Sequence, residues 1–295
     1  MRILGPLLTT SCAALSLGCT GAAGPAGPTA PPPELGADGF YAQYVDAAGI
    51  PVIASRAVDP AALEASADMI TAMMRHRPDL RAELVRQRYQ VAVIGEGEAL
   101  LDLPENAHWT KPAEDDPRLT RCERIHYEER IGRLTARQYW DARARAIGGQ
   151  YTAVAEEDVL GRPGSRYYGE TILVHEFAHN MLFAIEAVDP ALFLAIERAY
   201  ADALAQDLWF NEYAVTTIQE YWAEGTQFWF DSNRLVVVNG RQILGYRDLA
   251  AYDPALYRLL ARAYGERHAL PGDPFHLHPA RVPPGPIPEN TAEVC

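Results

Sequence analysis

The sequence predicts an α+β fold that is predominantly helical and contains a small sheet. Three Asp-Pro pairs, beginning at Asp59, Asp189 and Asp253, each precede a stretch with helical spacing of apolar residues. In such a pair the aspartate caps the helix and the proline occupies its first turn. Runs of β-branched residues are few and short, which limits the sheet. With 295 residues, 48% of them hydrophobic, the chain can bury a substantial core as one large domain or two small ones.

The first predicted elements lie before residue 160. A helix is expected over 60–75, and Pro78 opens a second, shorter helix. Residues 89–94 (YQVAVI) are typical of a strand, whereas residues 103–122 are polar and interrupted by prolines. Residues 151–159 are expected to be extended.

The remaining elements lie after residue 168. Further helices are expected over 169–188, 191–206, 217–230 and 254–264. The β-branched run 235–238 ends at Asn239-Gly240, a sequence typical of a hairpin turn. The chain has no internal repeat.

The N-terminus has the pattern of an export signal over residues 1–19. Arg2 provides a short positive region, and residues 3–17 are mostly apolar or small. The segment 16–19 (SLGC) resembles a bacterial lipoprotein cleavage site in which Cys19 is acylated, although Ser16 stands where leucine is usual. Ordinary secretion with cleavage nearby is the alternative. In both cases we expect the mature protein outside the cytoplasm, as a secreted, periplasmic or membrane-anchored protein.

Composition also predicts the domain boundaries. Residues 20–39 are rich in Pro, Gly and Ala without a hydrophobic period, so we expect a disordered linker there. A folded domain is expected over 40–270, followed by an unstructured Pro-rich tail over 271–295. No segment after the signal has 18 uninterrupted apolar residues, so membrane contact is expected only through a lipid on Cys19.

Charge and cysteine content exclude two classes of function. The 39 acidic and 26 basic residues give a net charge of −13, which would repel a phosphate backbone and argues against nucleic acid as a partner. No Cys-x-x-Cys pair occurs, so a thiolate zinc site is excluded. Cys122 and Cys295 lie beyond the signal region, and an oxidising compartment would allow them to form a disulfide.

The pentapeptide at 175–179 (HEFAH) is the strongest indication of function. On a helix, His175 and His179 lie on one face, so both imidazoles can bind a single metal ion. Glu176 then lies near the open coordination position, where it can take a proton from bound water. The surrounding residues are apolar, which predicts a buried helix. Taken alone, the pentapeptide leaves open a chance match on such a helix.

A catalytic zinc site usually has a third protein ligand. The metzincin pattern is excluded because Leu182 and Ile185 stand where its glycine and third histidine would lie. The best remaining donors are Glu220 and Glu224, which lie four residues apart in an apolar and aromatic stretch. Burying such carboxylates without a cation is costly, although a solvated acidic stripe is the alternative. One glutamate can bind the metal while the other orients a ligand histidine.

These residues together resemble the gluzincin metallopeptidases, specifically the catalytic domain of the anthrax lethal factor type. In that family, HExxH is followed by a tyrosine seven residues ahead of a Glu-aromatic-aromatic-Ala-Glu block, and Tyr213 precedes Glu220 by seven. The match covers about residues 168–231. The resemblance implies a zincin-like fold and the following roles: zinc on His175, His179 and Glu220, Glu176 as general base, Tyr213 as oxyanion donor, and Glu224 behind the ligands.

Other polar residues have weaker patterns. Glu156 and Glu157 can line a cleft or form a solvated edge. Asp141, Arg143 and Arg145 can form a buried ion cluster that supports the cleft, or Asp141 and Arg145 can pair on a helix surface. We expect structural or inert roles for the remaining candidate histidines, which are His108, His126, His276 and His278.

The sequence therefore predicts an exported zinc-dependent hydrolase, with a peptide or protein as its substrate. One alternative is an inactive, surface-tethered binding protein on the scaffold of a peptidase. Glu176 argues against it, because a site that only holds metal needs no base. The other alternative is a metal-dependent hydrolase acting on a different amide.

Overall fold

The computed structural model describes residues 27–117, 119, 121–287 and 291. The predicted export signal, with Cys19, and the terminal Cys295 lie outside these residues. None of the helices in the described part is both long and apolar enough to cross a membrane.

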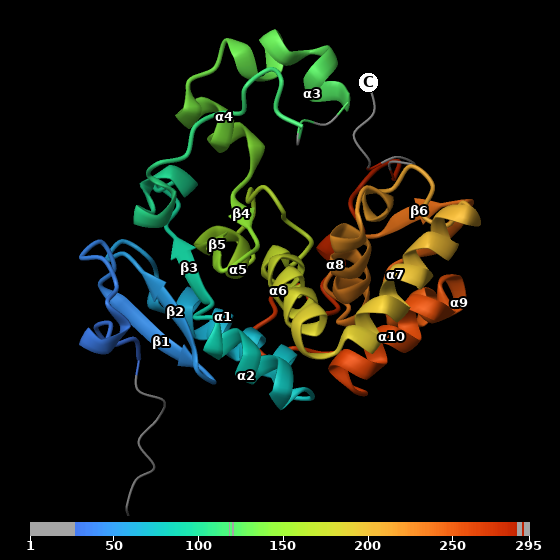
Figure 1. Ribbon diagram of the computed structural model, residues 1–295, viewed down its shortest axis with the longest axis horizontal. Coiled ribbons are helices and arrows are strands. Elements are labelled where there is room, and N and C mark those ends of the chain that lie inside the picture. Colours follow the sequence, from blue (N-terminus) through green and yellow to red (C-terminus); the bar gives the residue numbers. More distant parts are fainter. Residues whose placement is uncertain (1–26, 118, 120, 288–290, 292–295) are drawn as a thin grey trace, which may run out of the picture.

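A five-stranded mixed sheet lies on one side of the molecule (Figure 1), with the strand order β1-β2-β3-β5-β4. Its strands are β1 (Gln43–Ala47), β2 (Ile50–Ala54), β3 (Gln90–Ile94), β4 (Ala146–Ile147) and β5 (Tyr151–Ala155). Strands β2, β3 and β5 run parallel, and the two edge strands β1 and β4 run antiparallel to their neighbours. The short strand β4 therefore forms the edge that follows β5.

Both faces of the sheet are buried. Alternate residues of a strand point to opposite faces, and in β3 Val91 and Val93 join the large core. Ala92 and Ile94 join a smaller core on the other face. The helices that contribute to the large core include α1 (Pro60–Met74), α2 (Pro78–Arg86) and α6 (Ile172–Val188).

The C-terminal half adds a group of helices around α6. These are α7 (Pro190–Ala205), α8 (Ile218–Trp229), α9 (Tyr246–Tyr252) and α10 (Pro254–Tyr264). A hairpin of β6 (Val236–Val238) and β7 (Arg241–Ile243) lies between α8 and α9 in the chain. Among all element pairs, α6 and α8 share the most extensive contact, and they lie side by side in Figure 1. This helix pair positions the motif residues.

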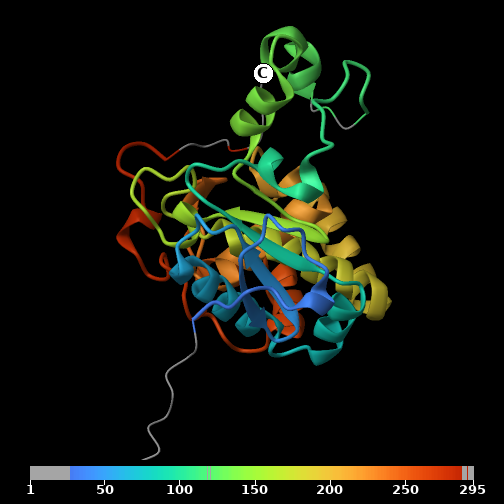
Figure 2. The same ribbon diagram turned by 90° about the vertical axis from the view of Figure 1, so that its left-hand side faces the viewer.

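A small lobe projects from the rest of the molecule in both views (Figures 1 and 2). It consists of α3 (Arg121–Ile125), the π-helical turn η4 (Glu128–Gly132) and α4 (Ala136–Arg143). Leu119, Ile131 and Tyr139 form its own small core. The short helices α5 (Glu156–Val159), η1 (Pro33–Leu35), η2 (Leu100–Asp102), η3 (Pro104–Asn106), η5 (Tyr213–Val215) and η6 (Pro279–Arg281) complete the described elements.

The predicted fold class, α+β with mostly helix and a small sheet, is confirmed. All three Asp-Pro helices form, and in each the aspartate side chain accepts a hydrogen bond from a backbone N–H of the first turn. The helices expected from Pro78 and over 217–230, the strand at 89–94 and the hairpin at Asn239-Gly240 also form.

Two element boundaries were predicted wrongly. Residues 151–159 are extended only through Ala155, after which α5 begins. The helix expected from residue 169 begins at Ile172. Gly169 has a φ of 104°, outside the helical region, and the Thr171 N–H donates to the Ser232 carbonyl instead of to a helical turn.

The linker and tail predictions also need correction. Residues 27–39 of the expected disordered linker contain η1, and Thr29 forms a β-bridge with Tyr44. The Pro-rich segment after Pro271 has little regular structure but is packed, because Phe275 and Arg281 are buried. The Arg281 side chain donates to the Asn233 carbonyl at 2.7 Å. Low hydrophobicity did not prevent these segments from being fixed by individual contacts.

Candidate metal centre

Helix α6 presents the HEFAH residues to α8. Apolar residues on the other sides of α6 are fully buried, including Leu173, Phe177 and Met181, and they fix the helix against the core. His175 is 5% exposed, and the side chains of Glu176 and His179 are 13% and 12% exposed. All three side chains are therefore largely shielded from solvent, and they lie within about one turn of the helix.

Helix α8 supplies the opposing carboxylates. Thr217 caps the helix, and its Oγ1 accepts a hydrogen bond from the Glu220 N–H at 3.2 Å. Glu220, Glu224 and Gln227 follow at intervals of four and three, so they lie on one face. That face is the one that meets His175.

The three predicted metal ligands lie together. His175 Nε2 is 2.9 Å from Glu220 Oε2, and His179 Nε2 is 3.7 Å from the same oxygen. One ligand atom from each of these residues lies within 4.8 Å of the other two. Ligands at 2.0–2.2 Å from a tetrahedral ion lie about 3.4 Å apart. The donor set and its spacing thus fit zinc.

The other ring nitrogen of His175 is fixed by α8. Its Nδ1 lies 3.0 Å from Gln227 Oε1 and 3.4 Å from Glu224 Oε1. Both are acceptors, so Nδ1 carries a proton, which leaves Nε2, on the Glu220 side, as the atom that would bind a metal. Asn233 donates to the second oxygen of Glu224 at 2.8 Å. Glu224 therefore lies behind His175, on the side away from Glu220.

The electrostatics of this cluster are unbalanced. In the described part of the chain, neither lysine nor arginine forms an ion pair with Glu176, Glu220 or Glu224. Burial alone would lower the pKa of His175, but hydrogen bonds with Glu220 and Glu224 outweigh it and raise that pKa well above its ordinary value. Three nearly buried carboxylates without a lysine or arginine partner favour a bound cation.

His179 and Glu176 have opposite pKa shifts with the same principal cause. Burial, with the nearby charge of His175, lowers the pKa of His179 to about 4, so its ring is neutral and able to donate a lone pair. Burial, with the charge of Glu220, raises the pKa of Glu176 to about 7, while His175 and a hydrogen bond from the Gly148 backbone act against it. A carboxylate in this range can both accept and return a proton near neutral pH.

Tyr213 lies beside this cluster, on η5. The residue is 41% exposed, and its ring centroid lies 6.3 Å from that of His175. Burial and the charge of Glu220 raise the pKa of Tyr213, so it remains a hydrogen-bond donor. Tyr213 in turn contributes to the lowered pKa of Glu220, after the larger, opposing effect of burial and the effect of His175.

Arg145 and Glu157, two further candidates from the sequence, form a separate cluster beside β4. Arg145 pairs with Glu157 at 2.7 Å rather than with Asp141, because α4 ends at Arg143. Asp141 instead pairs with Arg137. Glu156 is buried, not part of a solvated edge, and accepts from the backbone N–H groups of Asp59 and Glu96.

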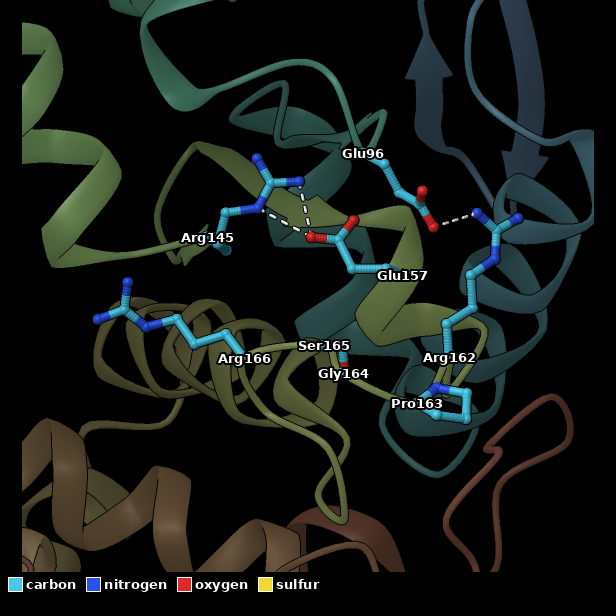
Figure 3. Close-up of a pocket in the computed structure, with 8 residues that line it drawn as sticks. All are labelled: Glu96, Arg145, Glu157, Arg162, Pro163, Gly164, Ser165 and Arg166. Atoms are coloured by element: carbon cyan, nitrogen blue, oxygen red, sulfur yellow. Dashed lines mark hydrogen bonds and ion pairs between the residues drawn. The ribbon is translucent and has the colours of Figure 1, made fainter.

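A pocket of about 560 Å³ opens next to Arg145 (Figure 3) and contains none of the metal-site residues. It is lined by Glu96, Arg145, Glu157, Arg162, Pro163, Gly164, Ser165 and Arg166. Two ion pairs across it, Arg145–Glu157 and Arg162–Glu96, largely neutralise its charge.

In the described part of the chain, the remaining candidate histidines and Cys122 are not members of the ligand cluster. His278 accepts a hydrogen bond from the Ala280 N–H, and His276 Nδ1 lies 3.3 Å from the Phe230 carbonyl, so both serve the packed tail. His126 faces Glu129 at 3.7 Å on the projecting lobe. Cys122 is buried and disulfide-bonded. Since Cys295 lies outside the described residues, the pairing of these two cysteines stays a prediction.

The structure adds three site residues that sequence reasoning missed. Gln227 binds His175, and its position seven residues after Glu220 could have indicated it. Gly148 contacts Glu176, and Asn180 lies behind that contact. No spacing rule connects either of these to the motif across the chain, although Asn180 directly follows His179.

Comparison with known proteins adds little to this geometry. No protein-family model matches the chain, and no curated protein matches it. Among solved structures, the chain is similar to the Pro-Pro endopeptidase PPEP-2 from Paenibacillus alvei, with a TM-score of 0.43 and 15% identity. That match covers 72% of this chain and 96% of the other. At this level of similarity, neither activity nor substrate transfers from that protein.

Proposed function

We propose that this protein is a zinc-dependent hydrolase of the gluzincin type and that it cleaves peptide bonds. The observation that carries the proposal is the convergence of His175 Nε2, His179 Nε2 and Glu220 Oε2 beside a second carboxylate, that of Glu176. A site that only holds metal would not need this additional acid–base group.

The metal would be held by His175, His179 and Glu220. When bound, zinc lowers the pKa of a coordinated water toward neutrality and polarises a substrate carbonyl. Glu176 accepts a proton from the attacking water at its carboxylate and later returns it to the leaving amine. Glu224 and Gln227 orient the His175 ring through Nδ1.

Tyr213 has the role of oxyanion donor in this proposal. Its hydroxyl is protonated at neutral pH and lies on the Glu220 side of the cluster. A donor that binds the developing negative charge more strongly than the ground-state carbonyl lowers the barrier. Replacing Tyr213 with phenylalanine should therefore lower kcat more than it changes KM.

The test compares the purified wild type with the variant Glu176→Gln. Bound zinc is measured by mass spectrometry, and cleavage is profiled on a mixed peptide library. We expect equal zinc content in the two proteins and loss of cleavage in the variant. Bound zinc with equal cleavage by both proteins would overturn the role of Glu176. Zinc without cleavage of any peptide would favour the binding protein or the hydrolase of another amide.

We also propose that the protein acts outside the cytoplasm, on a peptide or protein substrate, and that a lipid on Cys19 is its membrane anchor. Support comes from the sequence pattern of residues 1–19. Cell fractionation of the wild type and Cys19→Ala tests this. We expect the wild type in the membrane fraction and the variant in the soluble exported fraction. Recovery of the wild type in the cytoplasm would contradict export.

A further inference from the structure

The turn after β4 makes the closest approach to Glu176 from outside α6. A Cβ atom placed on Gly148 would lie 2.8 Å from the Glu176 carbonyl oxygen and 2.9 Å from His179 Cδ2. It would also lie 3.2 Å from Glu176 Oε2. The backbone of Gly148 therefore lies against the Glu176 carboxylate and the His179 ring. Glycine at this position lets the backbone approach the base where a side chain would prevent it.

A buried side chain holds this turn against α6. Asn180 is fully buried, and its Oδ1 accepts a hydrogen bond from the Gly149 N–H at 3.0 Å. Its Nδ2 donates to Thr152 Oγ1 at 2.7 Å, and the Thr152 hydroxyl donates to the Gly149 carbonyl at 2.8 Å. Thr152 is also fully buried. The three residues form a closed hydrogen-bond ring that fixes the peptide following Gly148.

The other end of β4 is fixed as well. Arg145 directly precedes the strand, and its guanidinium pairs with Glu157 (Figure 3). The same guanidinium donates to the Gly95 carbonyl at 3.2 Å and to the Glu98 carbonyl. Strand β4 itself pairs through only two residues, Ala146 and Ile147. Anchors at both ends therefore replace the rigidity that a longer strand would have.

We propose that Asn180, with Thr152, is a positioning residue for Glu176. It acts through the Gly148–Gly149 turn, which packs against the carboxylate of the base and the His179 ring. The catalytic consequence rests on the proposed function, whereas the hydrogen-bond path from Asn180 and Thr152 to the turn does not. Glutamate on a helix has several rotamers, and the packed turn restricts them. A misplacement of about 1 Å in a catalytic group can lower the rate by about 100-fold.

The first test measures kcat, KM and zinc content in matched variants. Thr152→Val removes the hydroxyl at nearly constant volume, and Thr152→Ser keeps it. We expect Thr152→Val to lower kcat by about 10-fold with KM within about twofold and zinc unchanged, and Thr152→Ser to restore most of the rate. Asn180→Leu should lower kcat by about 10- to 100-fold.

The control is Thr226→Val on α8. Thr226 is fully buried like Thr152, and its hydroxyl also donates to a backbone carbonyl, that of Trp222, at 2.8 Å. We expect kcat within about twofold of the wild type, because Thr226 has no contact with the turn. An equal loss of kcat in Thr226→Val and Thr152→Val would overturn the proposal. If Asn180→Leu does not fold, the comparison of Thr152→Val with Thr152→Ser decides whether the proposal holds.

The second test does not need catalysis. In protein labelled with ¹⁵N-glycine, the Gly148 amide signal reports how the turn packs against Glu176. We expect this signal to move in Glu176→Gln and to move in Thr152→Val and Asn180→Leu, but not in Thr226→Val. An unchanged signal in Thr152→Val and Asn180→Leu would overturn the proposed path from these two residues through the turn to Glu176. If the wild type cleaves no peptide, the proposed function fails, and this measurement still decides the positioning role.

Discussion

The metal-site cluster on α6 and α8 and the Arg145 cluster beside β4 both contain buried carboxylates, but only the second pairs its acidic groups with arginines. There Arg145 pairs with the mostly buried Glu157, and Arg162 pairs with the exposed Glu96. In the described residues, Glu176, Glu220 and Glu224 face imidazoles and neither lysine nor arginine. A self-neutralised cluster is explained by stability alone, whereas a cluster of lone-pair donors needs a ligand.

The largest effect that would separate the two clusters is loss of metal binding. Glu220→Ala removes a direct donor and should weaken zinc binding more than Glu224→Ala, which removes a partner of His175. Loss of such a partner weakens metal affinity by about 10- to 100-fold. Zinc titration with a competing chelator measures both. The reverse order of affinities would exchange the roles of Glu220 and Glu224.

Breaking the Arg145 cluster should lower the free energy of unfolding and not the affinity for metal. Arg145→Leu leaves Glu157 without its partner, and both side chains are mostly buried. We expect a loss of about 3 kcal/mol in the free energy of unfolding, since breaking a buried pair costs about 3–5 kcal/mol and partial exposure reduces it. Denaturant titration measures the loss. The double variant with Glu157→Leu should recover part of it, and no recovery would show that the pair itself is unimportant.

Zinc should stabilise the protein through the metal-site cluster only. At free zinc 100-fold above its dissociation constant, binding to the folded state adds about 2.7 kcal/mol. The melting temperature of the wild type should therefore rise with zinc and fall with a chelator, while that of Glu220→Ala should respond much less. An equal response in both proteins would place the bound ion elsewhere.

A smaller effect concerns the pH dependence of Asp158, next to Glu157 on α5. Burial raises the pKa of Asp158 to about 6, although the Tyr167 N–H bonds to it. The folded state therefore binds a proton that the unfolded state releases near pH 3.8. This contribution to stability is complete below pH 3.8 and is lost as the pH rises through 6, by on the order of 2 kcal/mol. In Asp158→Asn, unfolding curves between pH 4 and 7 should lose this slope, and an unchanged slope would assign it to another group.

The sequence predicted the parts of the fold that are determined locally. Asp59, Asp189 and Asp253 cap helices through contacts two or three residues away, so their effect is visible in the sequence. The hairpin of β1 and β2 was missed because its turn, Ala48-Gly49, lacks the usual Asn-Gly signal. Pro51 also lies within the second strand, and a proline in the sequence argues against a strand prediction.

The residues of the candidate site likewise divide into those that the sequence could predict and those that it could not. His175 and His179 share a helix face, and Glu220, Glu224 and Gln227 share another, so periodicity relates the members of each set. That the two faces meet was inferred from the chemistry of Glu220 and Glu224, the best remaining donors, and from the family resemblance, and not from spacing. The contact of Gly148 with Glu176 could not be predicted, because it depends on how the sheet edge approaches α6. Tertiary packing alone determines it.

The close approach of Gly148 has a consequence for mutational tolerance. The backbone that lies against Glu176 is common to all residue types. What a substitution at position 148 can remove is the space for it, since any Cβ would meet the Glu176 backbone and the His179 ring. Selection at this position would therefore act on size and not on chemical type. Drift in the neighbouring residues is limited only by the requirement to keep the turn in place.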